Sequence, residues 1–599
     1  MALPFDVLLA VCAQLPACAC VERGEYTAAL GCARDHAPGA FGATTELSAL
    51  RQTSRAWRAA ALHQGLRVVV ASSRWARSGT RLAAIRAAHG HHVRRLVFRS
   101  ADAYHGRRRS VGSPQRVSAD SHSQAGVSMA GSHSMDVDVD MDVAMDMDVA
   151  MADFLEKALA LAWPALAAVA VDWFGAEHVR IAAAVQRHAP RITDLWLRAK
   201  AATVAQVAPL LPARLARLAV VPYGFNAPWA ALQPSERGAA AAVRRMPAGQ
   251  LRALAVGGAD VTPELLAALA AAQPRLRELA IEHASVEALR GAAPLPSLAA
   301  LRLEHVMVGA DGELPLSSAA ALPGLAALSV RHVWRAADRN GDSARGAVSL
   351  QNAAWLAPLW AQRWAALRVL ALPAIADADA RALALACPAL ARLVTHSLDY
   401  AGPRLSAAGL AALLAGLPRL AHVAIEQRRA DGSPGYDVAG AALCRLLGCA
   451  DADDDARFGD RLLRVDRSLP SVCAAPLPGL RSLCIPAASF TAPVLDALVL
   501  QLPGLLFLSV TLRSSPTTKA PSALRPHHPL RRLALRADED MLADPRWLSA
   551  WLAERFPALR ECCTNHARSH RQTVAELRAL APAVSFTRLS SRALQTTCN

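Results

Sequence analysis

Sequence motifs that mark the common enzyme classes are missing from this chain of 599 residues. There is no G-x-S-x-G, no G-x-x-x-x-G-K, no H-E-x-x-H, and no G-x-G-x-x-G that opens a helix after a strand. These patterns position a nucleophilic serine, a phosphate, a zinc ion or a dinucleotide, so their absence leaves no enzyme class supported. We therefore expect a non-catalytic protein that needs no cofactor.

Lysine is scarce: Lys157, Lys200 and Lys519 are the only examples, although the chain carries a formal net charge of +16. Arginine therefore supplies nearly all of the positive charge. The arginines are scattered, and the densest short run is Arg107–Arg109, which argues against a nucleic-acid partner. A solvated basic surface is the simpler interpretation.

Long hydrophobic runs are also lacking. The longest stretch near the C-terminus, Ala497–Leu512, has Pro503 and Gly504 at its centre and is shorter than the roughly 20 residues of a membrane span. Near the N-terminus, Asp6 and the absence of a basic residue before Arg23 argue against a secretory signal. The sequence thus predicts no membrane partner and a cytoplasmic and/or nuclear location.

The 12 cysteines show no repeated pair spacing, so the sequence indicates no disulfide framework. Zinc ligands normally stand as C-x(2 to 4)-C pairs, and Cys18 and Cys20 are too close together to form one. We expect reduced thiols and no metal site.

A short phrase recurs along the chain: usually proline, any residue, then Leu-x-x-Leu-x-Leu with aliphatic substitutions. Most copies lie 22 to 30 residues apart, which is the period of leucine-rich repeats. Three longer steps indicate insertions or a degenerate repeat that the pattern misses. The first apolar residue of the phrase falls at Leu166, Ile192, Leu215, Leu251, Leu276, Leu298, Leu325, Leu367, Leu390, Leu420, Leu480, Leu505, Leu530 and Leu559.

Each unit combines two periodicities. Leu279 and Ile281 are two residues apart and face the same side of a short strand, while Leu276 enters from the preceding turn. Between strands the pattern predicts a helix, for example after Thr262, which can cap it, and Pro263. We expect an α/β solenoid with parallel strands on its concave side and helices on its convex side. An ordinary helical bundle is the alternative, but proline before most phrases would break its helices.

One unit resembles the cysteine-containing leucine-rich repeat, a subtype that is frequent in F-box proteins. Its cysteine is expected to pack in the core rather than to bind a ligand. The resemblance rests on Leu367, Leu370, Leu372, Ile375, Asp377, Leu383, Cys387, Pro388 and Leu390.

The N-terminus carries a second resemblance. Leu3–Leu15 is similar to the opening of an F-box, and Leu47–Arg58 to its close. The family docks a Skp-family adaptor that joins it to a cullin ubiquitin ligase, while the segment that follows holds the target. The apolar spacing agrees, because two or three short helices bury too little surface alone and a partner helix would complete their core. The predicted adaptor-binding residues are Leu3, Pro4, Val7, Leu8, Val11, Leu15, Leu47, Leu50 and Trp57.

The match departs from the family in one respect. A long segment, Pro16–Glu46, separates the two halves where the family has a short connection. We interpret it as an inserted loop, since doubling the length of a surface loop costs only about 0.6 kcal/mol. The alternative is that the same residues form a helical cap on the first repeat.

The sequence therefore divides into five parts. The ranges are 1–65 for the F-box-like helical module with its loop at 16–46, 66–99 for a linker and first atypical repeat, 100–152 for a low-complexity disordered segment rich in Asp, Val and Met, 153–589 for the solenoid with insertions near 331–354 and 427–476, and 590–599 for the tail.

A protein target is expected on the concave face, where strand residues between the buried leucines are displayed. Aromatic and arginine side chains are the usual anchors of protein interfaces. The predicted target-binding residues are Trp196, Arg198, Glu278, Arg302, Glu304, Arg331, His396, Glu426, Phe507 and Arg536.

These observations lead to one hypothesis, a substrate-recognition adaptor of an SCF-type (Skp-cullin-F-box) ubiquitin ligase. It would act by holding an unknown protein target near the ligase, so that transfer becomes effectively intramolecular. The alternative is a leucine-rich-repeat scaffold unconnected with ubiquitin. A third, weaker hypothesis is an arginine-driven surface associated with RNA or chromatin.

Overall fold

The fold is described from a computed structural model. It describes residues 68–72, 80–91, 93–99, 141–172, 177–199, 203–221, 238–256, 263–285, 295–308, 322–335, 357–395, 405–426, 436–437, 440–447, 477–512, 528–537, 551–564, 579 and 584–588. The F-box-like module predicted at 1–65 lies outside these residues. The chain divides into two compact units, residues 1–260 with 268–278, and residues 261–267 with 279–599.

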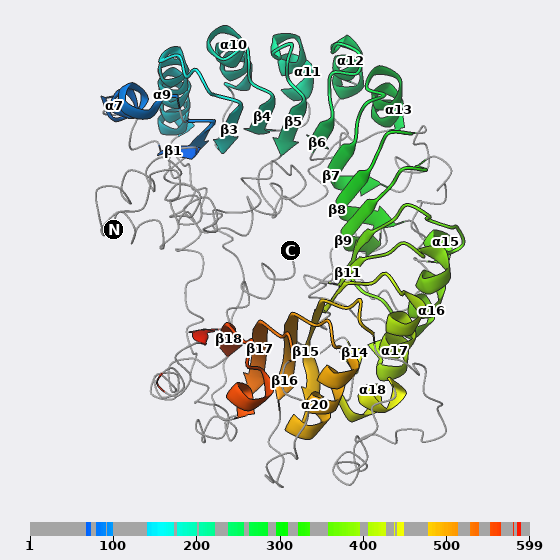
Figure 1. Ribbon diagram of the computed structural model, residues 1–599. Helices are drawn as coiled ribbons and strands as arrows, with labels where there is room; N and C mark the ends of the chain where they lie inside the picture. The colour runs from blue at the N-terminus through cyan, green and yellow to red at the C-terminus, as the bar shows by residue number, and fades with distance from the viewer. Residues whose placement is uncertain are drawn as a thin grey trace, which may run out of the picture. The chain divides into compact units, whose positions relative to one another are not determined.

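The first unit is built on a parallel sheet whose strands pair in the order of the chain. Helices lie between successive strands (Figure 1). The strands are β1 (Val68–Ser72), β2 (Arg95–Arg99), β3 (Ala168–Asp172), β4 (Asp194–Arg198), β5 (Arg217–Val221) and β6 (Ala253–Val256). The helices are α7 (Thr80–His89), α9 (Met141–Ala160), α10 (His178–His188), α11 (Thr203–Val207), the 3-10 turn η2 (Ala208–Leu210) and α12 (Gly238–Arg245); α13 (Pro263–Ala272) crosses the division between the units.

The second unit repeats the arrangement. Its strands are β7 (Glu278–Ser285), β8 (Ala300–Val308), β9 (Ala327–Arg335), β10 (Val369–Leu372), β11 (Arg392–Thr395), β13 (His422–Ile425), β15 (Ser482–Phe490), β16 (Phe507–Leu512), β17 (Arg532–Ala537), β18 (Glu561–Thr564) and β19 (Ser585–Arg588). From β8 to β19 each strand pairs in parallel with the next. The helices are α15 (Ala357–Trp360), α16 (Asp377–Ala386), α17 (Ala407–Gly416), α18 (Gly440–Leu446) and α20 (Ala492–Gln501), with a helical segment at 551–555. A separate two-stranded sheet joins β12 (Leu405–Ser406) to β14 (Tyr436–Asp437).

A repeated turn explains why the proline phrase forms this fold. The N–H of the first leucine donates to the carbonyl three residues earlier, as in Leu276 to Gln273 (3.0 Å) and Leu390 to Cys387 (3.0 Å). Proline follows the accepting residue in both examples, where its fixed φ suits a type I turn. The same turn therefore connects helix to strand in these repeats.

A second repeated contact fastens each repeat to the next. The carbonyl just before a strand accepts two N–H groups of the following repeat, as Arg368 does from Ala391 (2.8 Å) and Arg392 (2.9 Å). The leucine phrases thus form the strands of a parallel sheet, which confirms the leucine-rich-repeat solenoid and excludes the helical bundle.

The core lies between the sheet and its helices. Within β10, Leu370 and Leu372 are fully buried, while Ala371 between them is partly exposed. Cys387 is also fully buried, and burial raises the pKa of its thiol to about 12, so it stays protonated. The prediction that this cysteine is a core residue is confirmed.

The sheet continues across all three long steps of the repeat. β5 pairs directly with β6, β9 with β10 and β13 with β15. Between β13 and β15, the two-residue strand β14 pairs with β12 instead of joining the main sheet.

One sequence-based expectation is wrong in part. The prediction of disorder for 100–152 fails from Met141 onward, because these residues belong to α9, while 100–140 lie outside the described residues. The C-terminal half of α9 is anchored in the core, where Met151, Phe154, Leu155 and Leu159 are buried. A helix propagates readily from an anchored end, and the Met and Ala residues upstream are strong helix formers. The alternation of Asp with Val and Met hid this helical continuation.

Candidate protein-interaction face

The face of the sheet opposite the helices is the candidate site, and we call it the displayed face. Because side chains alternate along a strand, the residues between the buried leucines point to this face. The register aligns their central positions into one row per unit, here named the middle row. It contains Val97, Ala170, Trp196, Ala219 and Ala255 in the first unit and Arg302, Ser329, Ala371, Val394, Ala424, Cys484, Ser509, Ala534, Cys563 and Thr587 in the second.

Trp196 takes the expected place in the middle row but is only 8% exposed. Its neighbours across the two adjacent strands are Ala170 and Ala219, and these small side chains leave room for the indole. The indole N–H is buried without a hydrogen-bond partner among the described residues. Trp196 therefore forms part of the apolar floor of the displayed face and does not project from it as an anchor.

Phe507 is similarly buried, at 9% exposure. It forms a small apolar cluster with Ala424, Cys484 and Ala534, against which Val394 and Cys563 pack. The two aromatic residues predicted as anchors thus make apolar floor, because alanine and cysteine beside them leave space that the rings fill.

Three of the predicted site residues form one ion-pair cluster. Glu304 on β8 accepts from Arg302 of its own strand (3.0 Å) and from Arg331 of β9 (2.7 Å). Its side chain is only 5% exposed, whereas those of Arg302 and Arg331 are 17% and 22% exposed. A buried carboxylate is favourable only when it is paired and hydrogen-bonded, and here two guanidinium groups do this. The cluster carries a net positive charge toward the displayed face.

The remaining predicted residues are spread over the two units. Arg198, at the end of β4, is half-buried, and its carbonyl is 3.0 Å from His178 Nε2 at the start of α10. Glu278 is half-buried at the start of β7, and Arg536 is half-buried in β17. Glu426 follows β13, with its Oε1 3.8 Å from the Cys484 Sγ. The last predicted residue of the set, His396, and the whole adaptor-binding set lie outside the described residues.

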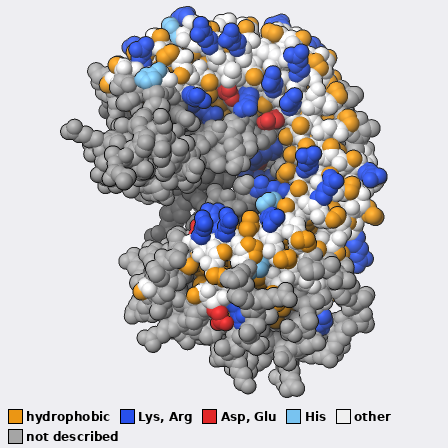
Figure 2. Space-filling model, in the orientation of Figure 1, with side chains coloured by type: hydrophobic (Ala, Val, Ile, Leu, Met, Phe, Trp, Pro, Cys, Tyr) orange, Lys and Arg blue, Asp and Glu red, His pale blue; other side chains and the backbone are white. Residues whose placement is uncertain are grey.

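Two further ion pairs on the displayed face were not predicted as pairs. Asp194 of β4 lies 3.5 Å from Arg217 of β5, and Glu561 of β18 lies 2.9 Å from Arg532 of β17. Each pair joins the first residues of neighbouring strands in register. Aligning the repeat phrases gives this strand register, so these ion pairs could have been predicted from the sequence. Among the described side chains visible in Figure 2, basic ones outnumber acidic ones.

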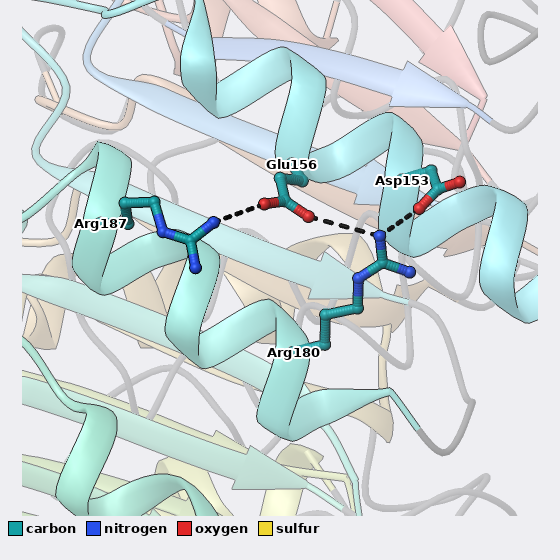
Figure 3. Close-up of polar contacts among 4 residues, drawn as sticks. All are labelled: Asp153, Glu156, Arg180 and Arg187. Carbon is teal, nitrogen blue, oxygen red and sulfur yellow. Dashed lines mark hydrogen bonds and ion pairs between the residues drawn. The ribbon is translucent and has the colours of Figure 1, made fainter.

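A polar network on the helical side was not predicted, because the repeat phrase specifies the strands and turns but not which helix side chains meet. Glu156 of α9 accepts from Arg187 of α10 (2.8 Å), and Arg180 of α10 contacts both Asp153 and Glu156 (Figure 3). Acids three residues apart on one helix thus face arginines seven residues apart on the next. The network holds α9 against α10.

Neither a metal centre nor a membrane span is found in the described part of the chain. Those residues contain no group of three or more His, Cys, Asp or Glu side chains arranged to hold a metal ion. None of the helices described is both long and apolar enough to cross a bilayer.

Comparisons with known proteins give matches only among solved structures. No protein-family model matches, and no curated protein matches. A chain of the Rad7–Elc1 complex in yeast is 14% identical with a TM-score of 0.25, over 48% of this chain and 77% of that one. The leucine-rich-repeat protein LegL7 from Legionella pneumophila is 11% identical with a TM-score of 0.26, over 70% and 92%. The APL1 leucine-rich-repeat domain is 12% identical with a TM-score of 0.26, over 73% and 87%. The strand register and the repeated turns establish the fold.

Proposed function

We propose that this leucine-rich-repeat chain is a target-recognition adaptor of an SCF-type ubiquitin ligase. In this proposal the displayed face holds a protein target and the N-terminal module docks a Skp-family adaptor. The chain itself makes and breaks no bond. It raises the effective concentration of the target at the ligase, where partner subunits transfer ubiquitin.

The observation that supports target binding is the parallel sheet with its displayed face. Successive strands carry the displayed residues in register, so neighbouring side chains form a continuous surface on each unit. The surface combines an apolar floor around Phe507 with charged groups such as the Arg302, Glu304 and Arg331 cluster. Apolar area with a polar surround is the usual composition of a protein interface.

The link to ubiquitin rests on the sequence of residues 1–65. Leu8, Val11 and Leu15 recur at helical spacing in the segment that resembles an F-box opening. Such a stripe on a short helix favours a partner helix that covers it.

A double substitution tests this link. We expect the full chain to co-purify with a Skp-family adaptor and Leu8→Asp with Leu15→Asp to abolish co-purification, because two charges would enter the apolar contact. Leu385→Asp is the matched control, since Leu385 is 82% exposed on α16 and its loss should change nothing. Thermal unfolding of each variant verifies that the repeats remain folded.

The runner-up is a leucine-rich-repeat scaffold whose residues 1–65 cap the first repeat. The long segment Pro16–Glu46 between the two halves of the F-box-like module favours it. In that case the double variant unfolds at a lower temperature and the wild type captures no adaptor. A parallel capture of partners with and without residues 1–65 separates the two functions. A ligase adaptor captures ligase subunits that are lost with residues 1–65, whereas a scaffold captures none in either case.

A further inference from the structure

Arginine is concentrated at one edge of the sheet in the second unit. The main sheet contains seven strands from β10 to β18, because β12 and β14 form the separate small sheet. The residue just before each of these strands and the first residue of the strand give fourteen positions, which hold six arginines and one acidic residue, Glu561. We call the six the arginine edge: Arg368, Arg392, Arg481, Arg531, Arg532 and Arg560.

The contacts at this edge leave it basic. Arg368, Arg481, Arg531 and Arg560 are exposed. Arg481 donates to the Gly504 carbonyl (3.2 Å), a contact that fixes its side chain without neutralising its charge. Glu561 pairs with Arg532 at 2.9 Å and so offsets a single arginine.

The positive charge of the arginine edge also affects the pKa of a neighbouring histidine. His422 is the first residue of β13, next in register to Arg392 of β11. Burial lowers the pKa of His422, and the positive charge of Arg392 lowers it further.

The length of the arginine edge follows from the number of strands that it crosses. β10, β11, β13, β15, β16, β17 and β18 are successive neighbours. Since adjacent strands lie about 4.8 Å apart, Arg368 and Arg560 are separated by about 29 Å along the sheet. An extended peptide advances about 3.3 Å per residue, so about nine residues would span the edge.

We infer that the arginine edge binds an acidic segment of a polypeptide. Guanidinium groups pair with carboxylates in a planar, bidentate geometry, and arginines at intervals of one or two strands can meet carboxylates distributed along an extended segment. The inference deepens the proposed function, on which it rests for the idea of a protein target, by naming the chemistry of that target.

The described residues favour a polypeptide over a nucleic acid. Single-stranded nucleic acids bind where bases stack on accessible aromatic side chains. Among the residues whose burial is described, no Phe, Tyr or Trp side chain is exposed, and Phe507, the first residue of β16 within the edge, is buried. The edge therefore offers charge without a stacking platform.

The test measures binding of a labelled nine-residue peptide of alternating Glu and Ala by fluorescence anisotropy, using the full chain. We expect the variant Arg368→Ala, Arg481→Ala, Arg560→Ala to bind at least about tenfold more weakly, as three exposed charge pairs are lost. Raising the ionic strength should weaken wild-type binding steeply, because exposed charges are screened.

The control is the variant Arg244→Ala, Arg245→Ala, Arg381→Ala, which removes the same charge from exposed positions on α12 and α16. It should bind like the wild type. Equal weakening in both variants, or unchanged binding in the edge variant, overturns the inference. So does an oligonucleotide of equal charge that binds more tightly than the peptide and loses its binding in the edge variant. Adaptor co-purification is unaffected by these substitutions, so this inference and the ligase proposal fail separately.

Discussion

At the scale of single residues, a displayed position in a repeat does not imply an exposed side chain. Trp196 and Phe507 stand where the repeat phrase places them, yet both are nearly buried because small residues surround them. The position of a residue in its strand follows from the phrase. Its exposure depends on the sizes of its neighbours on the adjacent strands, which lie more than twenty residues away in the chain.

The Arg302, Glu304 and Arg331 cluster shows that the sequence also does not indicate which displayed residues contact one another. All three residues were predicted as separate members of a binding face, and the structure joins them around one carboxylate. The sequence supplied the residues, but only the packing shows that Glu304 is buried between two guanidinium groups.

Replacing Glu304 tests the energetic role of this cluster. We expect Glu304→Gln to lower the free energy of unfolding by about 1–3 kcal/mol, because two partly buried arginines lose their counter-charge. Glu561→Gln is the comparison, since its partner Arg532 is 56% exposed and such pairs contribute less than about 1 kcal/mol. Urea unfolding of both variants gives the two values, and equal losses would contradict the assignment.

At the scale of elements, the strands and turns followed from the sequence while the contacts between helices did not. Leucine recurs in every copy of the phrase and proline in most of them, so the turn and strand were predictable. Helices such as α13 and α17 are mostly alanine and leucine, and nothing in that composition indicates which polar residues on neighbouring helices meet. Asp496 on α20 and Arg555 of the helical segment 551–555 are an example, 4% and 8% exposed and 3.4 Å apart.

The Asp496 carboxyl makes stability depend on pH. Burial raises its pKa to about 6, although the nearby Arg555 opposes this rise. An aspartate in the unfolded chain titrates near about 3.9, so the folded protein holds this proton more tightly. Its stabilising contribution is therefore present below about pH 4 and is lost as the pH rises through about 6.

We expect Asp496→Asn to remove this dependence. Between about pH 4 and pH 7 the wild type should lose about 1–3 kcal/mol of unfolding free energy relative to the variant. Urea midpoints measured across this range give the difference. Parallel curves for the two proteins would show that Asp496 does not titrate there.

At the scale of the whole molecule, the fold is a series of repeats that contact their neighbours in the sheet. The repeat period predicted this architecture, because each unit buries its leucines only by stacking on the next. The helical start of α9 was missed, since the alternating Asp residues obscured the period. In such an array, damage to one repeat is expected to stay local.

Gly440→Ala tests how far damage spreads. A Cβ atom at Gly440, the first residue of α18, would lie 2.5 Å from the Ser489 carbonyl oxygen and 2.4 Å from the Phe490 ring. We expect a loss of about 1–3 kcal/mol from this overpacking. Hydrogen exchange should accelerate in α17, α18 and β15 while β3, β4 and β5 keep their wild-type rates.

Gly324→Ala is the control for that experiment. Its added Cβ would meet only the Pro296 and Leu298 carbonyl oxygens, at 3.4 and 3.6 Å. Exchange should remain unchanged in this variant. A uniform acceleration across both units in Gly440→Ala would mean that the whole chain unfolds cooperatively.

The carbonyls that accept two N–H groups have a practical consequence for protein engineering. Those of Ala326 and Ala421 already join strands that are separated in the chain by the stretches ending at Arg368 and Arg481. A foreign recognition loop could be grafted into either stretch, since the paired hydrogen bonds that join the neighbouring strands lie outside it. The molecule therefore offers two ready acceptor sites for new specificity.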